Sequence, residues 1–255
     1  MTPDEVSLWI VSFRRQEALH RTITDWLASF PFDTVNIIAN DPTASYAETM
    51  ARWAQVKIWR NIFRDPWETG SIAWCWNQAM RHTFETRRWC LMSQDDVTIT
   101  PGWDQLVTDR YDTYIAPVGD TIQLQSLDGF NAAGWFDERF RAIGGPEADY
   151  LLRCLQSHPG RLSAHDEHVW QLRHNDVGLA DYWKPSPRAG EVVETRAAFN
   201  VPFAQAECFD RWQQKWGVHV DELMTRTADA VRQPGWDEID WYPSFTRRLT
   251  EMGRR

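Results

Sequence analysis

Apolar residues in the first part of the chain follow two alternating patterns. Short apolar runs that contain β-branched residues are typical of buried strands, and they occur at Val6–Phe13, Val35–Ala39, Val56–Trp59 and Trp89–Met92. Between the first two runs, apolar residues recur three and four positions apart, which indicates one buried face of a helix. We predict helices at Gln16–Phe30, Tyr46–Ala54 and Ser71–Phe84. This alternation predicts an α/β fold with a mostly parallel central sheet and helices on both faces.

The regular pattern stops after about residue 180. There Lys184-Pro185-Ser186-Pro187 interrupts it, because each proline lacks a backbone donor and has a restricted φ. We therefore predict a main domain at residues 1–180. The remaining residues, 181–255, are expected to form a C-terminal extension of loops and short helices that packs on the same domain.

Composition and charge narrow the function classes. The 255 residues include 27 Lys and Arg against 36 Asp and Glu, a net charge of −9, which is opposite to the balance of proteins that bind nucleic acid through phosphates. The sequence has neither a membrane-length apolar run nor a basic start followed by an apolar run, so we expect a cytoplasmic location. Sixteen tryptophans are compatible with a large core or with a cleft in which indole rings stack on sugars or bases.

Two adjacent acids, Asp95 and Asp96, follow the apolar run Trp89–Met92. In parallel α/β sheets, ligands bind outside the carboxyl ends of the strands. A hard divalent cation takes one or two carboxylates together with phosphate oxygens and water. Neighbouring residues of an extended chain point to opposite sides, so at most one acid faces a given ligand. The alternative is that the two acids begin a turn or cap a helix.

Thr100-Pro101-Gly102-Trp103 follows the acidic pair, and here the sequence resembles bacterial family 2-like nucleotide-sugar glycosyltransferases of the GT-A (Rossmann-like) fold. In that family an Asp-x-Asp metal motif ends the central strand and often precedes Pro-Gly-Trp. Counting back from Pro-Gly-Trp places the second acid on Asp96 and the first on Gln94, which departs from the pattern. The resemblance implies that Asp96 binds Mn²⁺ or Mg²⁺ and that Asp95 contributes to nucleotide binding.

The nucleotide side of the resemblance rests on two strand ends. Asp41 stands where these enzymes carry an acid that reads the nucleotide base, and Ser12, Phe13 and Arg14 match the positions that line the same base. The segment 70–79 resembles the helix before the metal strand. The resemblance therefore implies a nucleotide-sugar donor bound within residues 1–180.

The acceptor side rests on two further segments. Gly134–Phe140 and Gly144–Arg153 resemble the acceptor-side signature, which places the catalytic acid of inverting members on Glu147, where it would act as general base toward the acceptor hydroxyl. From the residues alone, an acid in the first turn of a helix also stabilises the helix dipole. Asp149 is expected to be either a structural acid or a contact to an acceptor hydroxyl. A weaker match, Lys215-Trp216-Gly217, resembles the tail of bacterial members.

Three further side chains are candidates for the same site. His174 fits the position of a late metal-binding histidine of the family, and neutral imidazole is a suitable ligand for Mn²⁺-like ions. Trp103 and Trp135 flank the proposed cleft in sequence, so either ring can stack on a sugar or acceptor, with core packing as the alternative.

Together these features predict a metal-dependent hexosyl- or pentosyltransferase that moves a sugar from a nucleotide diphosphate to a hydroxyl of a glycan or related acceptor. One alternative is a non-catalytic sugar- or nucleotide-binding module of the same fold, which Gln94 keeps open. Another is a glycosyltransferase that modifies DNA bases, although the net charge disfavours a nucleic acid acceptor. A nucleotidyltransferase would need a Gly-rich loop after the first strand, and this chain has Ser12-Phe13-Arg14-Arg15-Gln16 there.

Overall fold

A seven-stranded sheet in the order β3-β2-β1-β4-β6-β5-β7 forms the centre of this protein. The computed structural model describes residues 1–13, 16–40, 45–61, 72–99, 101–115, 122–140, 145–158, 161–164 and 210–217. Its strands are β1 (Val6–Ser12), β2 (Val35–Ala39), β3 (Val56–Arg60), β4 (Trp89–Gln94), β5 (Thr113–Ile115), β6 (Ile122–Ser126) and β7 (Leu162–Ala164). Its helices are α1 (Gln16–Ser29), α2 (Ala47–Arg52), α3 (Ile72–Thr83), α4 (Leu127–Ala133) and α5 (Gly145–Ser157), with a 3-10 turn, η1, at Trp103–Leu106.

The predicted α/β fold is confirmed, because all four predicted strands and all three predicted helices are present. Strands β1 to β4 are parallel to one another, β6 is antiparallel to both β4 and β5, and β7 is parallel to β5. Six of the seven strands therefore run in one direction. Of the predicted extension at 181–255, the structure describes only residues 210–217, of which 210–216 are helical.

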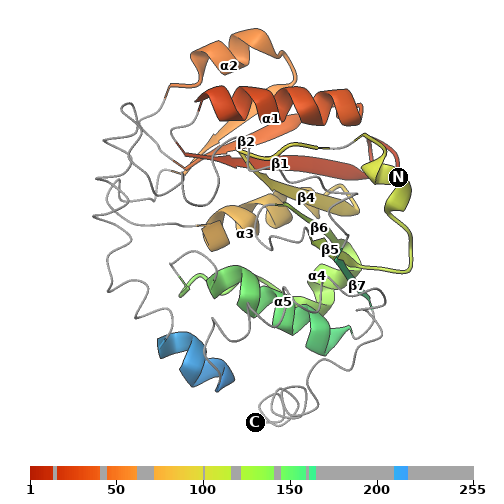
Figure 1. Cartoon of the computed structure of the whole chain (residues 1–255), viewed down its shortest axis with the longest axis vertical. Helices are drawn as coiled ribbons and strands as arrows, with labels where there is room; N and C mark the ends of the chain where they lie inside the picture. The colour runs from red at the N-terminus through yellow and green to blue at the C-terminus, as the bar shows by residue number, and fades with distance from the viewer. Residues whose placement is uncertain are drawn as a thin grey trace.

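Helices cover both faces of the sheet, and one apolar cluster lies on each face. Figure 1 shows α1 and α2 on one side of the sheet and α3, α4 and α5 on the other. The first cluster includes Leu19, Ile23 and Trp26 of α1, and the second includes Trp76 and Met80 of α3 and Tyr150 of α5. Among the described residues, no helix has both the length and the apolar character needed to cross a membrane.

The strands β5, β6 and β7 were not predicted from the sequence. β6 alternates apolar and polar residues, a pattern that usually indicates a half-exposed strand, but the whole strand is buried. Two of its polar side chains bind other residues of the protein: Oε1 of Gln125 accepts from the hydroxyl of Thr113 at 2.8 Å, and the hydroxyl of Ser126 donates to Oδ1 of Asp112 at 3.1 Å. β5 and β7 contain three residues each, which is too short for a periodic pattern.

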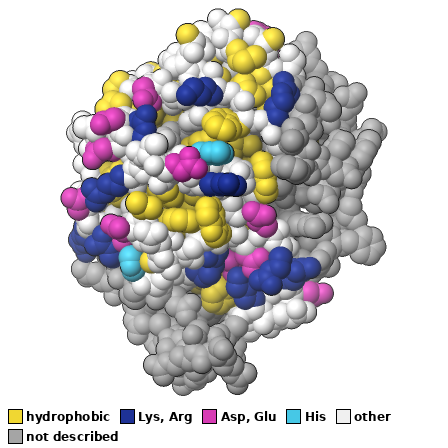
Figure 2. All heavy atoms as spheres, turned by 180° about the vertical axis from the view of Figure 1, so that it is seen from behind, with side chains coloured by type: hydrophobic (Ala, Val, Ile, Leu, Met, Phe, Trp, Pro, Cys, Tyr) yellow, Lys and Arg dark blue, Asp and Glu magenta, His cyan; other side chains and the backbone are white. Residues whose placement is uncertain are grey.

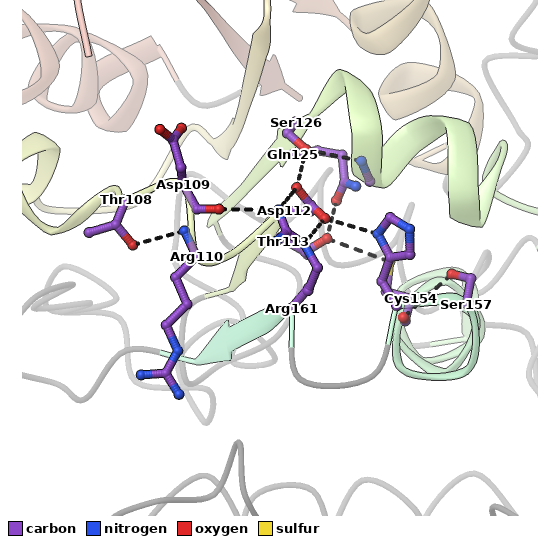
Figure 3. Close-up of polar contacts among 12 residues, drawn as sticks. Thr108, Asp109, Arg110, Asp112, Thr113, Gln125, Ser126, Cys154, Ser157 and Arg161 are labelled. Carbon is purple, nitrogen blue, oxygen red and sulfur yellow. Dashed lines mark hydrogen bonds and ion pairs between the residues drawn. The ribbon is translucent and has the colours of Figure 1, made fainter.

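A buried carboxylate, Asp112, fixes the direction of α5 (Figure 3). Asp112 lies just before β5 and is bound by the guanidinium of Arg161, which lies just before β7. Nδ1 of His158, directly after α5, lies 2.9 Å from Oδ2 of Asp112, and the hydroxyl of Ser126 donates to Oδ1 at 3.1 Å. Because α5 ends at the edge of the sheet where β5 and β7 begin, it starts at the opposite edge, where β1 to β4 end.

This carboxylate makes folding sensitive to acid. Burial alone would raise the pKa of Asp112, but hydrogen bonds and charge from Arg161, with further hydrogen bonds from His158 and Ser126, hold it below the ordinary value of 3.8. A carboxyl whose pKa is lowered by folding stabilises the protein above its unfolded pKa, and that contribution is lost as the pH falls through the folded pKa.

We therefore expect Asp112→Asn to lower the free energy of unfolding by about 2 kcal/mol at pH 7, the size of a charge-assisted hydrogen bond. The difference between variant and wild type should shrink as the pH is lowered below about 4. Urea denaturation at a series of pH values measures both quantities. Asp109→Asn is the control, because Asp109 pairs with Arg88 at an exposed position and exposed pairs contribute little. A difference that is constant from pH 7 to pH 3 would contradict this role.

Candidate functional site

Strands β1 to β4 end at one edge of the sheet, which we call the carboxyl edge. The register pairs Val11 with Gln94, Ser12 with Ala39, and Ala39 with Arg60. The residues that follow these strands therefore lie next to one another. They are Phe13 after β1, Asn40 after β2, Asn61 after β3, and Asp95 after β4. All four come from predicted strand ends, which is where ligands bind in parallel α/β sheets.

Asp95 joins the ends of β1 and β4. The backbone N–H of Phe13 donates to Oδ2 of Asp95 at 3.1 Å, and Asp95 is buried. Ser12 is also buried, and its carbonyl accepts a hydrogen bond from the backbone N–H of Asn40 at 2.9 Å. Three of the residues predicted to bind a nucleotide, Ser12, Phe13 and Asp95, are therefore brought together at the carboxyl edge.

Asp96 follows Asp95 and is only 6% exposed. The chemistry of this pair fits a divalent ion that receives its other ligands from phosphate oxygens and water. Within the described ranges, no group of three or more His, Cys, Asp and Glu side chains is arranged to hold a metal.

A pair of buried asparagines at the carboxyl edge was missed in the sequence. Nδ2 of Asn61 donates to Oδ1 of Asn40 at 3.0 Å, and the backbone N–H of Asn61 donates to the carbonyl of Ala39 at 3.1 Å. Both side chains are almost fully buried. Each asparagine directly follows a strand, and this position is the signal that could have identified both. The pair links the ends of β2 and β3, just before the position predicted to read the base.

Several predicted site residues lie outside the described residues. Arg14 and Asp41 directly follow Phe13 and Asn40 in sequence, and His174 comes after β7, which ends at the carboxyl edge. Glu147 belongs to α5, whose first turn lies toward the carboxyl edge. Its side chain also lies outside the described part. The roles of these four residues stay predictions.

Asp149 takes the first of the two roles expected for it, a structural acid, and not the alternative role of an acceptor contact. Its side chain is 0% exposed. Its carboxylate accepts from Nε of Arg153 at 3.0 Å and from Nε1 of Trp216 at 2.9 Å, and it pairs with Nζ of Lys215 at 2.6 Å. A carboxylate enclosed by these three partners is not accessible to an acceptor hydroxyl.

The two candidate tryptophans have different environments. Trp103 is 1% exposed and packs among aromatic rings of the first apolar cluster, with its centroid 5.5 Å from Trp26 and 6.2 Å from Phe32. Its Nε1–H donates to the hydroxyl of Ser29. The ring has no accessible face for a sugar, so the predicted sugar contact is wrong for Trp103. Trp135 is 48% exposed, and its contact with an acceptor stays a prediction.

The segment that precedes α5 is held from two directions. Asn77 of α3 accepts from the backbone N–H of Phe136 at 2.8 Å and donates to the carbonyl of Phe136 at 3.0 Å. On the other side, Asp137 binds Arg139 and Lys215. The hydrogen bonds from Arg139, opposed by partial burial and assisted by Lys215, hold the pKa of Asp137 well below its usual range. Asp137 therefore carries its charge at neutral pH and serves as an anchor.

Comparison with known proteins gives remote structural likeness only. No family model matches the chain, and no curated protein matches it. Among solved structures, a mannosyltransferase from Pyrobaculum calidifontis in complex with GDP-Man and Mn²⁺ is similar with a TM-score of 0.47 and 11% identity, covering 99% of this chain and 88% of that chain. A glycosyltransferase involved in glycosylation of the major capsid of PBCV-1 has a TM-score of 0.34 and 12% identity, covering 64% of this chain and 82% of that chain.

The assignment of Trp103 to the core can be tested by stability. Trp103→Ala should lower the free energy of unfolding by about 3–5 kcal/mol, because removal of a buried aromatic ring loses transfer free energy and leaves a cavity. Trp135→Ala is the matched control and should cost much less, since nearly half of that side chain is already exposed. Urea denaturation measures both variants. Similar losses for the two variants would contradict the different environments of these rings.

Proposed function

We propose that this chain is a metal-dependent glycosyltransferase that moves a hexose or pentose from a nucleotide-diphosphate sugar to a hydroxyl of a glycan or related acceptor. The observation that carries the proposal is the hydrogen bond between Phe13 and Asp95. It joins the strand end that resembles a nucleotide-lining segment to the acidic pair that resembles a metal motif. A cytoplasmic location is part of the same proposal.

The nucleotide would lie across the ends of β1 and β2. Asp41, which follows Asn40, would accept hydrogen bonds from the base, while Ser12, Phe13 and Arg14 would line the base and Asp95 would hold the β1 end in place. The Asn40–Asn61 pair supports this arrangement. Its two side-chain amides are buried and hydrogen-bonded to each other, which keeps the end of β2 rigid.

Asp96 would hold the metal, with His174 as a second protein ligand. A bound Mn²⁺ or Mg²⁺ would supply Lewis-acid stabilisation of the charge that develops on the leaving diphosphate. The low exposure of Asp96 and Asp95 supports this role, because water-excluded carboxylates interact more strongly with a cation than exposed ones do.

Glu147 would accept the proton of the acceptor hydroxyl as that oxygen attacks the anomeric carbon. Its place in the first turn of α5, on the side of the carboxyl edge, supports this role. Trp135, exposed on the segment before α5, would offer an aromatic face to the acceptor.

The surface gives less support to a nucleic acid acceptor. On the face that Figure 2 displays, the Lys and Arg side chains of the described residues are interspersed with Asp and Glu. Binding to a phosphate backbone favours a continuous basic surface. A non-catalytic binding module remains the alternative to an enzyme, and release of free nucleoside diphosphate from a donor distinguishes the two.

Nucleotide and metal binding can be tested by thermal unfolding with UDP, GDP, CDP and dTDP, each with and without Mn²⁺. A ligand that binds only the folded state raises the midpoint by mass action, so we expect one nucleotide to raise it more with Mn²⁺ than without. Asp96→Asn should abolish the Mn²⁺-dependent part of the shift. The control Asp109→Asn, at the opposite edge of the sheet, should retain it. A flat panel for wild type, or an unchanged shift for Asp96→Asn, would count against the metal site.

The general base can be tested by kinetics with the donor that the panel selects. Glu147→Gln should lower kcat by roughly 10²–10⁴-fold, the usual contribution of a positioned base, with little change in donor KM. Glu85→Gln, an exposed acid between α3 and β4, is the control and should behave as wild type. Equal losses in kcat and donor affinity would argue that Glu147 binds the donor instead.

A further inference from the structure

The helical segment 210–216 is tied to α5 by a lysine between two carboxylates. Nζ of Lys215 lies 2.6 Å from Oδ1 of Asp149 and 3.0 Å from Oδ2 of Asp137. The two carboxylates belong to different segments, α5 and the stretch before it, and the side chains of Asp149 and Asp137 are 0% and 11% exposed. An ammonium shared by two carboxylates this close offsets a repulsion that would otherwise push the two segments apart.

Aromatic packing holds the same segment in place. Trp216 donates its Nε1–H to Asp149 at 2.9 Å. Trp212 is fully buried, with its ring centroid 6.0 Å from that of Phe140 and 5.9 Å from that of Trp216. In Figure 1 the segment 210–216 lies below the end of α5 that faces the carboxyl edge. The charged and the aromatic contacts therefore converge on one place, the beginning of α5.

The stretch at 134–140 links these contacts to α3. Asn77 binds both backbone groups of Phe136 and donates to Oε1 of Glu138 at 2.7 Å. Phe136 in turn stacks on Tyr150 of α5, with centroids 4.0 Å apart. The first part of α5 is thus enclosed between α3 on one side and the segment 210–216 on the other. Among the described contacts, Lys215 is the cation that reaches both Asp137 and Asp149.

We propose that Lys215 and Trp216 are positioning residues, which fix the beginning of α5 and so place Glu147 against the acceptor; this rests on the proposed function. Glu147 stands two positions before Asp149 in the same helix. A rigid helix transmits the position of Asp149 to Glu147. The segment 210–216 therefore contributes to turnover without contacting donor or acceptor.

Two variants of Lys215 separate its charge from its packing. Lys215→Met removes the ammonium but keeps much of the apolar side chain, whereas Lys215→Arg keeps the charge. We expect Lys215→Met to lower kcat by about 10- to 100-fold, the cost of misplacing a catalytic group by about an ångström, with donor KM and the nucleotide-dependent thermal shift unchanged. Lys215→Arg should recover most of kcat. Lys57→Met, which removes an exposed lysine from β3, is the control for net charge.

Amide hydrogen exchange of the whole chain tests the positioning independently of activity. Backbone amides of α5 should exchange faster in Lys215→Met than in Lys215→Arg or Lys57→Met, while those of β1 and β2 stay unchanged. If Lys215→Met folds poorly, Trp216→Phe, which replaces the indole by a smaller phenyl ring and removes the N–H bound to Asp149, should produce a smaller increase at the same amides. Wild-type exchange in α5 of Lys215→Met, or wild-type kcat in that variant, would overturn the proposal. Absence of turnover in wild type would instead refute the proposed function, and the exchange data would still decide whether Lys215 positions α5.

Discussion

The hydrogen bond from the backbone of Phe13 to the carboxylate of Asp95 is the contact on which the candidate site depends. A strand that ends inside the protein leaves backbone groups that need partners, because an unsatisfied buried N–H costs free energy comparable to a lost hydrogen bond. At the end of β1 that partner comes from the residue after β4. This requirement fixes the two strand ends to each other. It also places Asp96, the next residue, at the carboxyl edge of the sheet.

Buried carboxylates fix the second half of the molecule as well. Asp112 binds Arg161 and His158 where α5 ends, and Asp149 binds Arg153 and Lys215 where α5 begins. Breaking such a buried pair is costly because it leaves an uncompensated charge. The same cost makes the geometry selective, since α5 must be placed so that both carboxylates meet their cations. The position of α5 against the sheet is therefore set by electrostatics at both of its ends, in addition to apolar packing.

The sequence was sufficient to predict β1 to β4 and the helices between them. In β1, β2, β4, α1 and α3 the apolar pattern reflects burial directly. It failed for β6, where Gln123 and Gln125 are buried against the second apolar cluster. A glutamine in a strand normally faces water, and only tertiary partners such as Thr113 make its burial possible. Strand pairing of this kind depends on residues distant in sequence, so local periodicity cannot reveal it.

In the candidate site, too, some features follow from the local sequence and others depend on residues distant in the chain. Ser12, Phe13 and Asp95 could be placed at the carboxyl edge, because the end of an apolar strand can be recognised from neighbouring residues. The sequence could not decide between the two roles expected for Asp149, since its partner Trp216 lies 67 positions further along the chain. An acid in a helix has the same local pattern whether it faces a ligand or a lysine of a distant segment. Its position in the sequence shows where the carboxylate lies in the fold, but only its partner determines whether it is available for binding or serves as an anchor.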